Sequence, residues 1–306
     1  MKNKWTLLLF PLLFLFYSCS ISVNLDIKAY NIKNNDNDTL AFYLATNNNK
    51  LSDKLLVMVQ GSGRNSIKRR FGWGAEAATL GYDILYLEKF AYNDSLLFVK
   101  SDCRERRLND IHFVINYVTK NIYKNKLVEI FIIADSEGGA LVPELAYNNK
   151  KVRRAIILSS GGFEQARQFK LLLNKENEGN YKGFLSLNGI SSQSDLEKQF
   201  KIIKDNPSEN KLWLGHSYKY WNSYLWYNPD NIIDSLTIPI LILIGDKDRY
   251  VPVESVKYLQ KKYKYKTNIT IKILKGLDHQ YKDSKGNRQF SKVLKDIILP
   301  WYKSTS

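Results

Sequence analysis

The chain has 306 residues, of which 44% are hydrophobic and 25% are charged, a balance typical of globular proteins and too apolar for a disordered one. Its length suits one large domain or two small ones. Two cysteines are too few for a fold built on disulfide bonds. The net charge of +16 would favour contact with an anionic surface; the alternative is a lysine-rich composition that only reflects an AT-rich genome. It does not indicate nucleic-acid binding, because the basic residues are scattered and no recognition motif is present.

The N-terminus has the pattern of an export signal. Two lysines precede an apolar run over residues 5–17, which is followed by Ser18 and Cys19. A run of about 13 residues is too short to span a bilayer but suits the apolar part of a signal peptide. The small residue directly before cysteine resembles the lipobox of bacterial lipoproteins. That resemblance implies a lipid anchor on Cys19 and a place in the cell envelope; the alternative is an ordinary cleaved signal in which Cys19 is incidental.

Strands and helices are predicted to alternate along most of the remaining chain. Apolar residues recur at helical spacing within 108–118, 253–259 and 290–297. A leading hairpin followed by this alternation predicts an α/β fold with a doubly wound, mostly parallel sheet. The predicted strands are 24–32 and 39–46, joined by an Asn- and Asp-rich turn, and then 55–60, 83–87, 128–133, 154–158, 238–244 and 269–274.

The alternation is interrupted once. Residues 162–235 are polar, lysine-rich and predicted to be helical, with a dense aromatic run over 213–227. An insertion of this size between two strands predicts a lid over the carboxyl edge of the sheet. The expected organisation is therefore a signal peptide (1–18), a mature N-terminus with the first strand (19–38), a core in two parts (39–161 and 236–306) and the helical lid insertion (162–235).

A serine stands in a tight turn between a predicted strand and a predicted helix. The residues around Ser136 form a variant of the G-x-S-x-G motif, with Ala134 in the first glycine position. The motif needs small residues two before and two after the serine, and Ala134 and Gly138 meet that need. It predicts Ser136 as a nucleophile and the Glu137 N–H as an oxyanion donor at a helix N-terminus. The alternative is a serine that only caps the helix.

Acid and base candidates follow two later strands. Asp246 and Asp248 both come directly after the apolar run 238–244, where a carboxylate can accept an imidazole N–H. Each is also compatible with a simple turn role. His279 follows the last predicted strand, and the order Ser, Asp, His is that of one hydrolase fold.

A glycine-bearing turn supplies a second group of backbone donors. Gly61 and Ser62 follow the predicted strand 55–60, and the N–H of one of them is expected to face the developing oxyanion. Any tight turn between a strand and a helix would have the same appearance, so this turn gains meaning only beside the other motifs.

Together these motifs resemble the α/β-hydrolases over nearly all of residues 40–303. The matching segments are the turn 60–63, the nucleophile turn 134–138, the acid loop 245–252 and the histidine loop 277–279. In the family pattern G-x-x-D-x-x-V-P the acid aligns with Asp248 rather than Asp246. The sequence departs from the family in Gln60, which replaces the more usual His, and in Ala134, which replaces Gly.

The resemblance implies acyl transfer through an acyl-enzyme. His279 would take the proton of Ser136 while Asp248 orients the imidazole. A carboxylic-ester hydrolase is the first expectation; a serine peptidase or thioesterase of the same fold, and a non-catalytic surface binding protein, are the alternatives. No cofactor or metal is expected, because the histidines and cysteines lack metal-ligand spacing.

The substrate is expected to be a small-molecule or glycan-linked acyl compound. Arg64, Arg69 and Arg70 follow the glycine turn and are candidates to bind a carboxylate, sulfate or phosphate, with a solvated basic face as the alternative. Tyr220 and Trp221 are candidates for an acyl- or sugar-binding wall, and packing of the insertion against the core explains them equally well.

Overall fold

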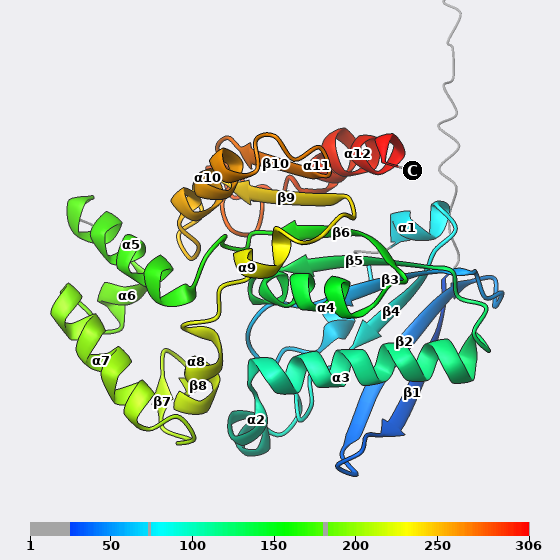
Figure 1. The fold of residues 1–306 in the computed structure, drawn as a ribbon, viewed down its shortest axis with the longest axis horizontal. Helices are drawn as coiled ribbons and strands as arrows, with labels where there is room; N and C mark the ends of the chain where they lie inside the picture. The colour runs from blue at the N-terminus through cyan, green and yellow to red at the C-terminus, as the bar shows by residue number, and fades with distance from the viewer. Residues whose placement is uncertain (1–24, 73–74, 180–182, 306) are drawn as a thin grey trace, which may run out of the picture.

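An eight-stranded sheet forms the centre of the computed structural model, which describes residues 25–72, 75–179 and 183–305 (Figure 1). The strand order is β1-β2-β4-β3-β5-β6-β9-β10. The pairs β1–β2 and β2–β4 are antiparallel and the others are parallel, which confirms the predicted sheet. The strands are β1 (Leu25–Lys33), β2 (Thr39–Asn47), β3 (Lys54–Val59), β4 (Asp83–Leu87), β5 (Glu129–Asp135), β6 (Val152–Leu158), β9 (Ile240–Gly245) and β10 (Ile269–Leu274).

The N-terminal hairpin follows from its turn residues. Asn34 Oδ1 accepts the backbone N–H groups of Asp36 (3.0 Å) and Asp38 (2.9 Å), and Asn37 has a positive φ of 61°. Asparagine tolerates this left-handed conformation and bonds to its own backbone, so the turn is encoded locally. The predicted signal peptide and Cys19 lie outside the described residues.

Helices cover both faces of the sheet. Leu55, Val57 and Val59 of β3 lie in one buried cluster and the alternate residues Leu56 and Met58 lie in a second one on the opposite face. This alternation is the period of two expected for a strand buried on both sides. The helices of the core are α1 (Ala75–Thr79), α2 (Ser95–Ser101), α3 (Arg104–Tyr117), α4 (Val142–Asn148), α10 (Val253–Lys262), α11 (Phe290–Val293) and α12 (Leu299–Ser304), with 3₁₀ turns η1 (Ile67–Arg70) and η3 (Ser136–Leu141) and π-helical turns η2 (Val118–Ile122) and η4 (Leu294–Ile298).

The insertion between β6 and β9 lies beyond the carboxyl ends of the parallel strands, at the left of Figure 1. An aromatic cluster holds it together: Phe169 and Trp213 contact each other and each contacts Phe200 and Trp221, with ring centroids 5.1 to 6.4 Å apart. Its elements are α5 (Gln165–Glu178), α6 (Phe184–Leu187), α7 (Gln193–Asp205), the two-stranded ribbon of β7 (Leu212–Trp213) and β8 (His216–Ser217), α8 (Tyr218–Tyr224) and α9 (Asp230–Ile233). The helices are as predicted, the ribbon is not, and the lid role remains a prediction.

Within the described part of the chain, no helix has both the length and the apolar character needed to cross a membrane.

Candidate active site

Ser136 directly follows β5 and is the first residue of η3, in a strained turn. Its φ is +52°, a conformation that L residues rarely adopt. Gly61 lies directly against this turn, since a Cβ added to Gly61 would be 2.9 Å from the Ser136 Cβ. A strained strand-to-helix turn that presents a serine at the carboxyl edge of the sheet is the geometry of a nucleophile elbow.

The loops that carry the acid and the base are brought together by the last two strands. Strands β9 and β10 are parallel neighbours, so their carboxyl ends open at the same edge. Gly245 ends β9, and a Cβ there would lie 2.0 Å from the Leu277 carbonyl oxygen. Only glycine therefore lets the histidine loop cross so close to the acid loop.

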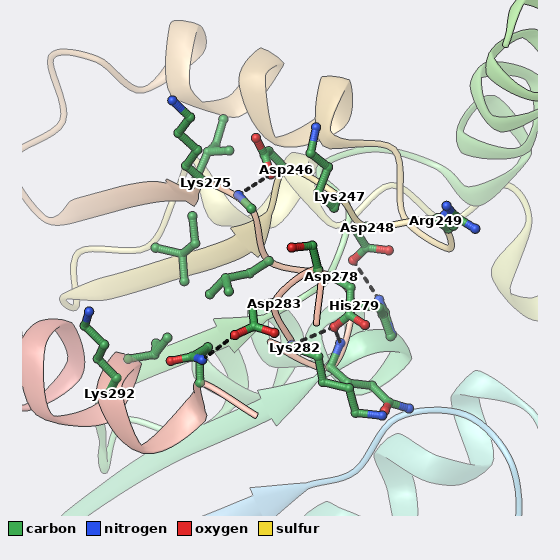
Figure 2. A pocket seen from close by; sticks show the side chains of 18 of the residues that line it. Asp246, Lys247, Asp248, Arg249, Lys275, Asp278, His279, Lys282, Asp283 and Lys292 are labelled. Atoms are coloured by element: carbon green, nitrogen blue, oxygen red, sulfur yellow. Dashed lines mark hydrogen bonds and ion pairs between the residues drawn. The ribbon is translucent and has the colours of Figure 1, made fainter. Parts of the chain in front are cut away.

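Ser136, His279 and Asp248 form one hydrogen-bonded chain. His279 Nε2 lies 3.1 Å from Ser136 Oγ. His279 Nδ1 lies 2.7 Å from Asp248 Oδ2, as Figure 2 shows. The other oxygen of Asp248 accepts the backbone N–H groups of Tyr250 (2.8 Å) and Val251 (2.9 Å). With both oxygens bonded and the side chain fully buried, Asp248 is fixed in the orientation that meets the imidazole.

The second candidate acid has a different contact. Asp246 Oδ1 accepts the N–H of Gly276 at 2.7 Å, as Figure 2 shows, and so ties the two loops together without touching the histidine. His279 is held from its backbone as well, because Ser159 Oγ donates to its carbonyl oxygen at 3.0 Å. Of the two carboxylates predicted, the structure places only Asp248 against the base.

Two hollows meet at Ser136. The smaller, about 260 Å³, is walled by aromatic residues of the insertion, including Tyr220 and Trp221, and by Ser62. The larger, about 680 Å³, is lined by Gly61, Ser62, Tyr281, three arginines (Arg69, Arg70 and Arg288) and two carboxylates (Glu76 and Asp135). A third, open hollow of about 1370 Å³ lies between the acid and histidine loops and does not include Ser136 (Figure 2).

The three arginines predicted to bind an anionic group of the substrate do not all lie at the site. Arg69 and Arg70 line the larger hollow, and Arg70 Nη2 forms an ion pair with Asp135 Oδ2 at 2.8 Å. Arg64 lines neither hollow at Ser136; its Nη1 lies 3.4 Å from the Tyr92 carbonyl oxygen. Arg288, nine residues after His279, also lines the larger hollow and was not predicted, because it belongs to none of the family motifs.

Gly61 and Ser62 of the glycine turn lie beside the nucleophile turn. Burial raises the pKa of Asp135, while Arg70, His279 and a hydrogen bond from the Gly61 backbone act to lower it. Ser62 is the turn residue that borders both hollows.

The sequence interpretation missed the surroundings of the Glu137 side chain. This carboxylate is buried and accepts hydrogen bonds from Arg107, Tyr220 and Tyr224, the last at 2.9 Å. A signal for Arg107 was available: it shares the spacing of Ile111 and Val114 on the buried face of α3, where a charged residue needs a buried partner.

Among the described residues, no group of three or more His, Cys, Asp and Glu is arranged to hold a metal ion.

Comparison with known proteins gives the family. None of the curated proteins matches the sequence, but the BD-FAE family model matches residues 40–263. Among solved structures, Est1E from Butyrivibrio proteoclasticus, determined with ferulic acid bound, has a TM-score of 0.61 at 20% identity, covering 90% of this chain and 100% of that one. The esterase Pf2001 from Pyrococcus furiosus has a TM-score of 0.57 at 15% identity, with 92% of each chain covered.

A peptidase has the same fold. The acylaminoacyl peptidase from Pyrococcus horikoshii has a TM-score of 0.60 at 14% identity, and the match covers 92% of this chain and 42% of that one. At these identities the likenesses establish the fold, whereas the family model spans most of the chain and establishes the family. The chain belongs to the BD-FAE family and is an α/β-hydrolase.

Proposed function

We propose that the protein is a serine hydrolase that cleaves an ester-type acyl bond, with a carboxylic ester as substrate. The observation that carries this is the hydrogen-bonded chain from Ser136 through His279 to Asp248. A serine hydroxyl within reach of an imidazole that is itself oriented by a buried carboxylate has the arrangement needed for nucleophilic catalysis.

In the proposed reaction His279 Nε2 takes the proton of Ser136 as its oxygen attacks the substrate carbonyl. Asp248 stabilises the imidazolium that forms. The N–H of Glu137 and that of Ser62 would bind the oxyanion, with Ser62 preferred to Gly61 because Ser62 borders both hollows at the nucleophile. His279 then protonates the leaving alcohol, and water, activated by the same imidazole, hydrolyses the acyl-enzyme.

The two hollows suggest how a substrate would lie. With the scissile carbonyl at Ser136, one side of the ester would occupy the aromatic hollow of about 260 Å³ and the other the larger arginine-lined one. The larger hollow would favour a group that is polar or carries negative charge. Lipophilic groups would be favoured in the aromatic hollow, where Tyr220 and Trp221 form part of the wall.

The test is hydrolysis of a series of p-nitrophenyl esters by the purified protein and by its Ser136→Ala variant. We expect activity that the variant loses, with a preference for short acyl chains because the aromatic hollow is small. Labelling of Ser136 by a fluorophosphonate without esterase activity would instead indicate the peptidase or thioesterase alternative. Absence of both would reject the enzyme and favour a binding protein that retains the fold.

A further inference from the structure

The residue that follows the nucleophile has an unusually well-bound side chain. Glu137 is buried with a side-chain exposure of 6%, yet its carboxylate accepts hydrogen bonds from Arg107 Nη1, Tyr220 Oη and Tyr224 Oη and lies 3.9 Å from Lys89 Nζ. These donors come from α3, from α8 of the insertion and from the segment after β4. The carboxylate therefore joins three separate parts of the chain at the nucleophile turn.

The guanidinium of Arg107 makes a second contact that reaches the other side of the site. Its Nη2 donates to the Gln60 carbonyl oxygen at 2.6 Å, while its Nη1 donates to Glu137. The Gln60 carbonyl belongs to the peptide group that opens the Gly61–Ser62 turn. A single buried guanidinium thus connects the two segments that carry the candidate oxyanion donors.

We infer that Arg107 and Glu137 are positioning residues for the oxyanion hole: the guanidinium sets the distance between the Glu137 N–H and the donors of the Gly61–Ser62 turn. This inference rests on the proposed function. Oxyanion donors act only within about 2.7–3.1 Å of the oxyanion, so a small displacement of one segment relative to the other weakens transition-state binding. The planar guanidinium suits this task because its donors are held in a fixed fork.

The electrostatics of the cluster agree with this geometry. Burial alone would raise the pKa of Glu137, but the neighbouring Lys89 and Arg107 bring it to about 2. The carboxylate is therefore charged over the whole working range of a hydrolase. Arg107, for its part, is buried, and the nearby negative charge of Glu137 raises its pKa against the opposing effect of burial. Each of the two buried charges is therefore stabilised by the other, and removing one would leave the other buried and unpaired.

The test compares Arg107→Lys with wild type, because lysine keeps the charge but lacks the guanidinium fork. We expect kcat to fall by about 10- to 100-fold with KM within about threefold, since one donor of an oxyanion hole is typically worth about 10²–10³ in kcat and here it is displaced rather than lost. The affinity of a trifluoromethyl ketone, which forms a tetrahedral adduct with the serine, should fall by the same factor as kcat/KM.

Arg106→Lys is the matched control. Arg106 is the preceding residue of α3 and also bridges two acceptors, Asp110 and Asp38, each at 2.7 Å, but it touches neither oxyanion segment. It should leave kcat unchanged whatever its effect on stability. Glu137→Gln, which removes the charge at constant shape, is the second test variant and should give the same fall in kcat.

Rates are normalised to the fraction of protein that fluorophosphonate labels, so that misfolded material does not count. The inference is overturned if labelled Arg107→Lys and Glu137→Gln have wild-type kcat, or if their loss lies in KM alone. Failure of the proposed function is a different result, because the wild type itself would then neither label nor hydrolyse esters.

Discussion

Two carboxylates, Asp248 and Asp246, follow strand β9 and differ in the groups that they contact. Asp248 bonds the His279 imidazole, whereas Asp246 bonds the backbone of Gly276. Both residues directly follow a predicted strand, so both were candidates for the catalytic acid. The family pattern alone favoured Asp248. Which oxygen meets which donor depends on the crossing of two loops that are about 30 residues apart, and no local pattern encodes that.

Asp248→Asn is expected to lower kcat by about 10³- to 10⁴-fold with little change in KM. An amide in this place cannot hold the imidazole in the required tautomer or stabilise its charged form. Steady-state kinetics on a p-nitrophenyl ester measure the effect. Asp246→Asn is the control: it should lower the melting temperature while kcat stays near wild type, and the reverse result would exchange the roles of the two residues.

The arginines that line the larger hollow predict that the protein binds a negatively charged ester more tightly than a neutral one. Arg69 of η1 and Arg288 of the loop before α11 both line the space beside Ser136. Replacing both by Ala should raise KM several-fold for an ester that carries a carboxylate and leave KM for a matched neutral ester unchanged. Arg64→Ala, outside both hollows, is the control. An equal change for both esters would assign the arginines to a solvated basic face.

At the scale of elements, the sequence predicted the strands of the main sheet and the helices of the insertion but missed the ribbon of the insertion. Buried parallel strands are continuous apolar runs, so their positions were readable to within two residues. Strands β7 and β8 have two residues each, too short to show a period, and were missed. Buried ion pairs such as Arg107–Glu137 were missed for another reason: their partners lie 30 residues apart and meet only in the folded chain.

The aromatic cluster predicts how the insertion is stabilised. Phe169 of α5 contacts the rings of Phe184, Phe200, Trp213 and Trp221 and also lines the smaller hollow. Phe169→Ala should cost about 3–5 kcal/mol of stability, because it leaves a cavity at the centre of the cluster.

We expect this loss to be local. Limited proteolysis of the Phe169→Ala variant should cut first within residues 162–235, and kcat/KM should fall because the wall of the hollow loosens. Leu187→Ala is the control, since Leu187 lies in α6 of the same insertion and is 68% exposed. Cleavage that begins equally in the sheet would mean that the insertion and the core unfold as one unit.

For the molecule as a whole, the buried carboxylates Glu137 and Asp102 make opposite contributions to the response to acid. The pKa of Glu137 is about 2 in the folded protein against an ordinary value of 4.5, so between these values the unfolded chain binds more protons than the folded one. The stability that Glu137 contributes is complete above pH 4.5 and is lost as the pH falls toward 2. Burial raises the pKa of Asp102 to about 6, which gives the opposite slope between about pH 4 and 6.

Urea unfolding at a series of pH values measures these slopes. Asp102→Asn should remove a decrease in stability on going from pH 4 to pH 6 of up to about 1.4 kcal/mol per pH unit, the value for one proton. Asp195→Asn is the control, because Asp195 is an exposed residue whose pKa is lowered by the hydroxyl of Ser192 and therefore has no part in that window. Identical profiles for wild type and Asp102→Asn would show that Asp102 does not titrate there.

Attachment of the protein to a membrane through a lipid on Cys19 remains a proposal. If Cys19 is lipidated, six Cα–Cα steps lead from it to Leu25, where β1 begins, and an extended chain spans at most about 22 Å over that length. Strand β1, at one edge of the sheet, would then be held close to the bilayer. The chain without Lys2 and Lys4 has a net charge of +14, which would favour an anionic lipid surface.

We therefore expect the protein, expressed in a bacterial host, to incorporate labelled palmitate and to sediment with the membrane fraction. Cys19→Ser should abolish the label and release the exported protein in soluble form, because one thiol is the only attachment point proposed. Cys103→Ser is the control: Cys103 is buried at the start of α3, so its replacement should leave both label and sedimentation unchanged. A Cys19→Ser variant that still carries the label would place the anchor elsewhere, and one that loses the label yet still sediments would show that surface charge alone holds the protein at the membrane.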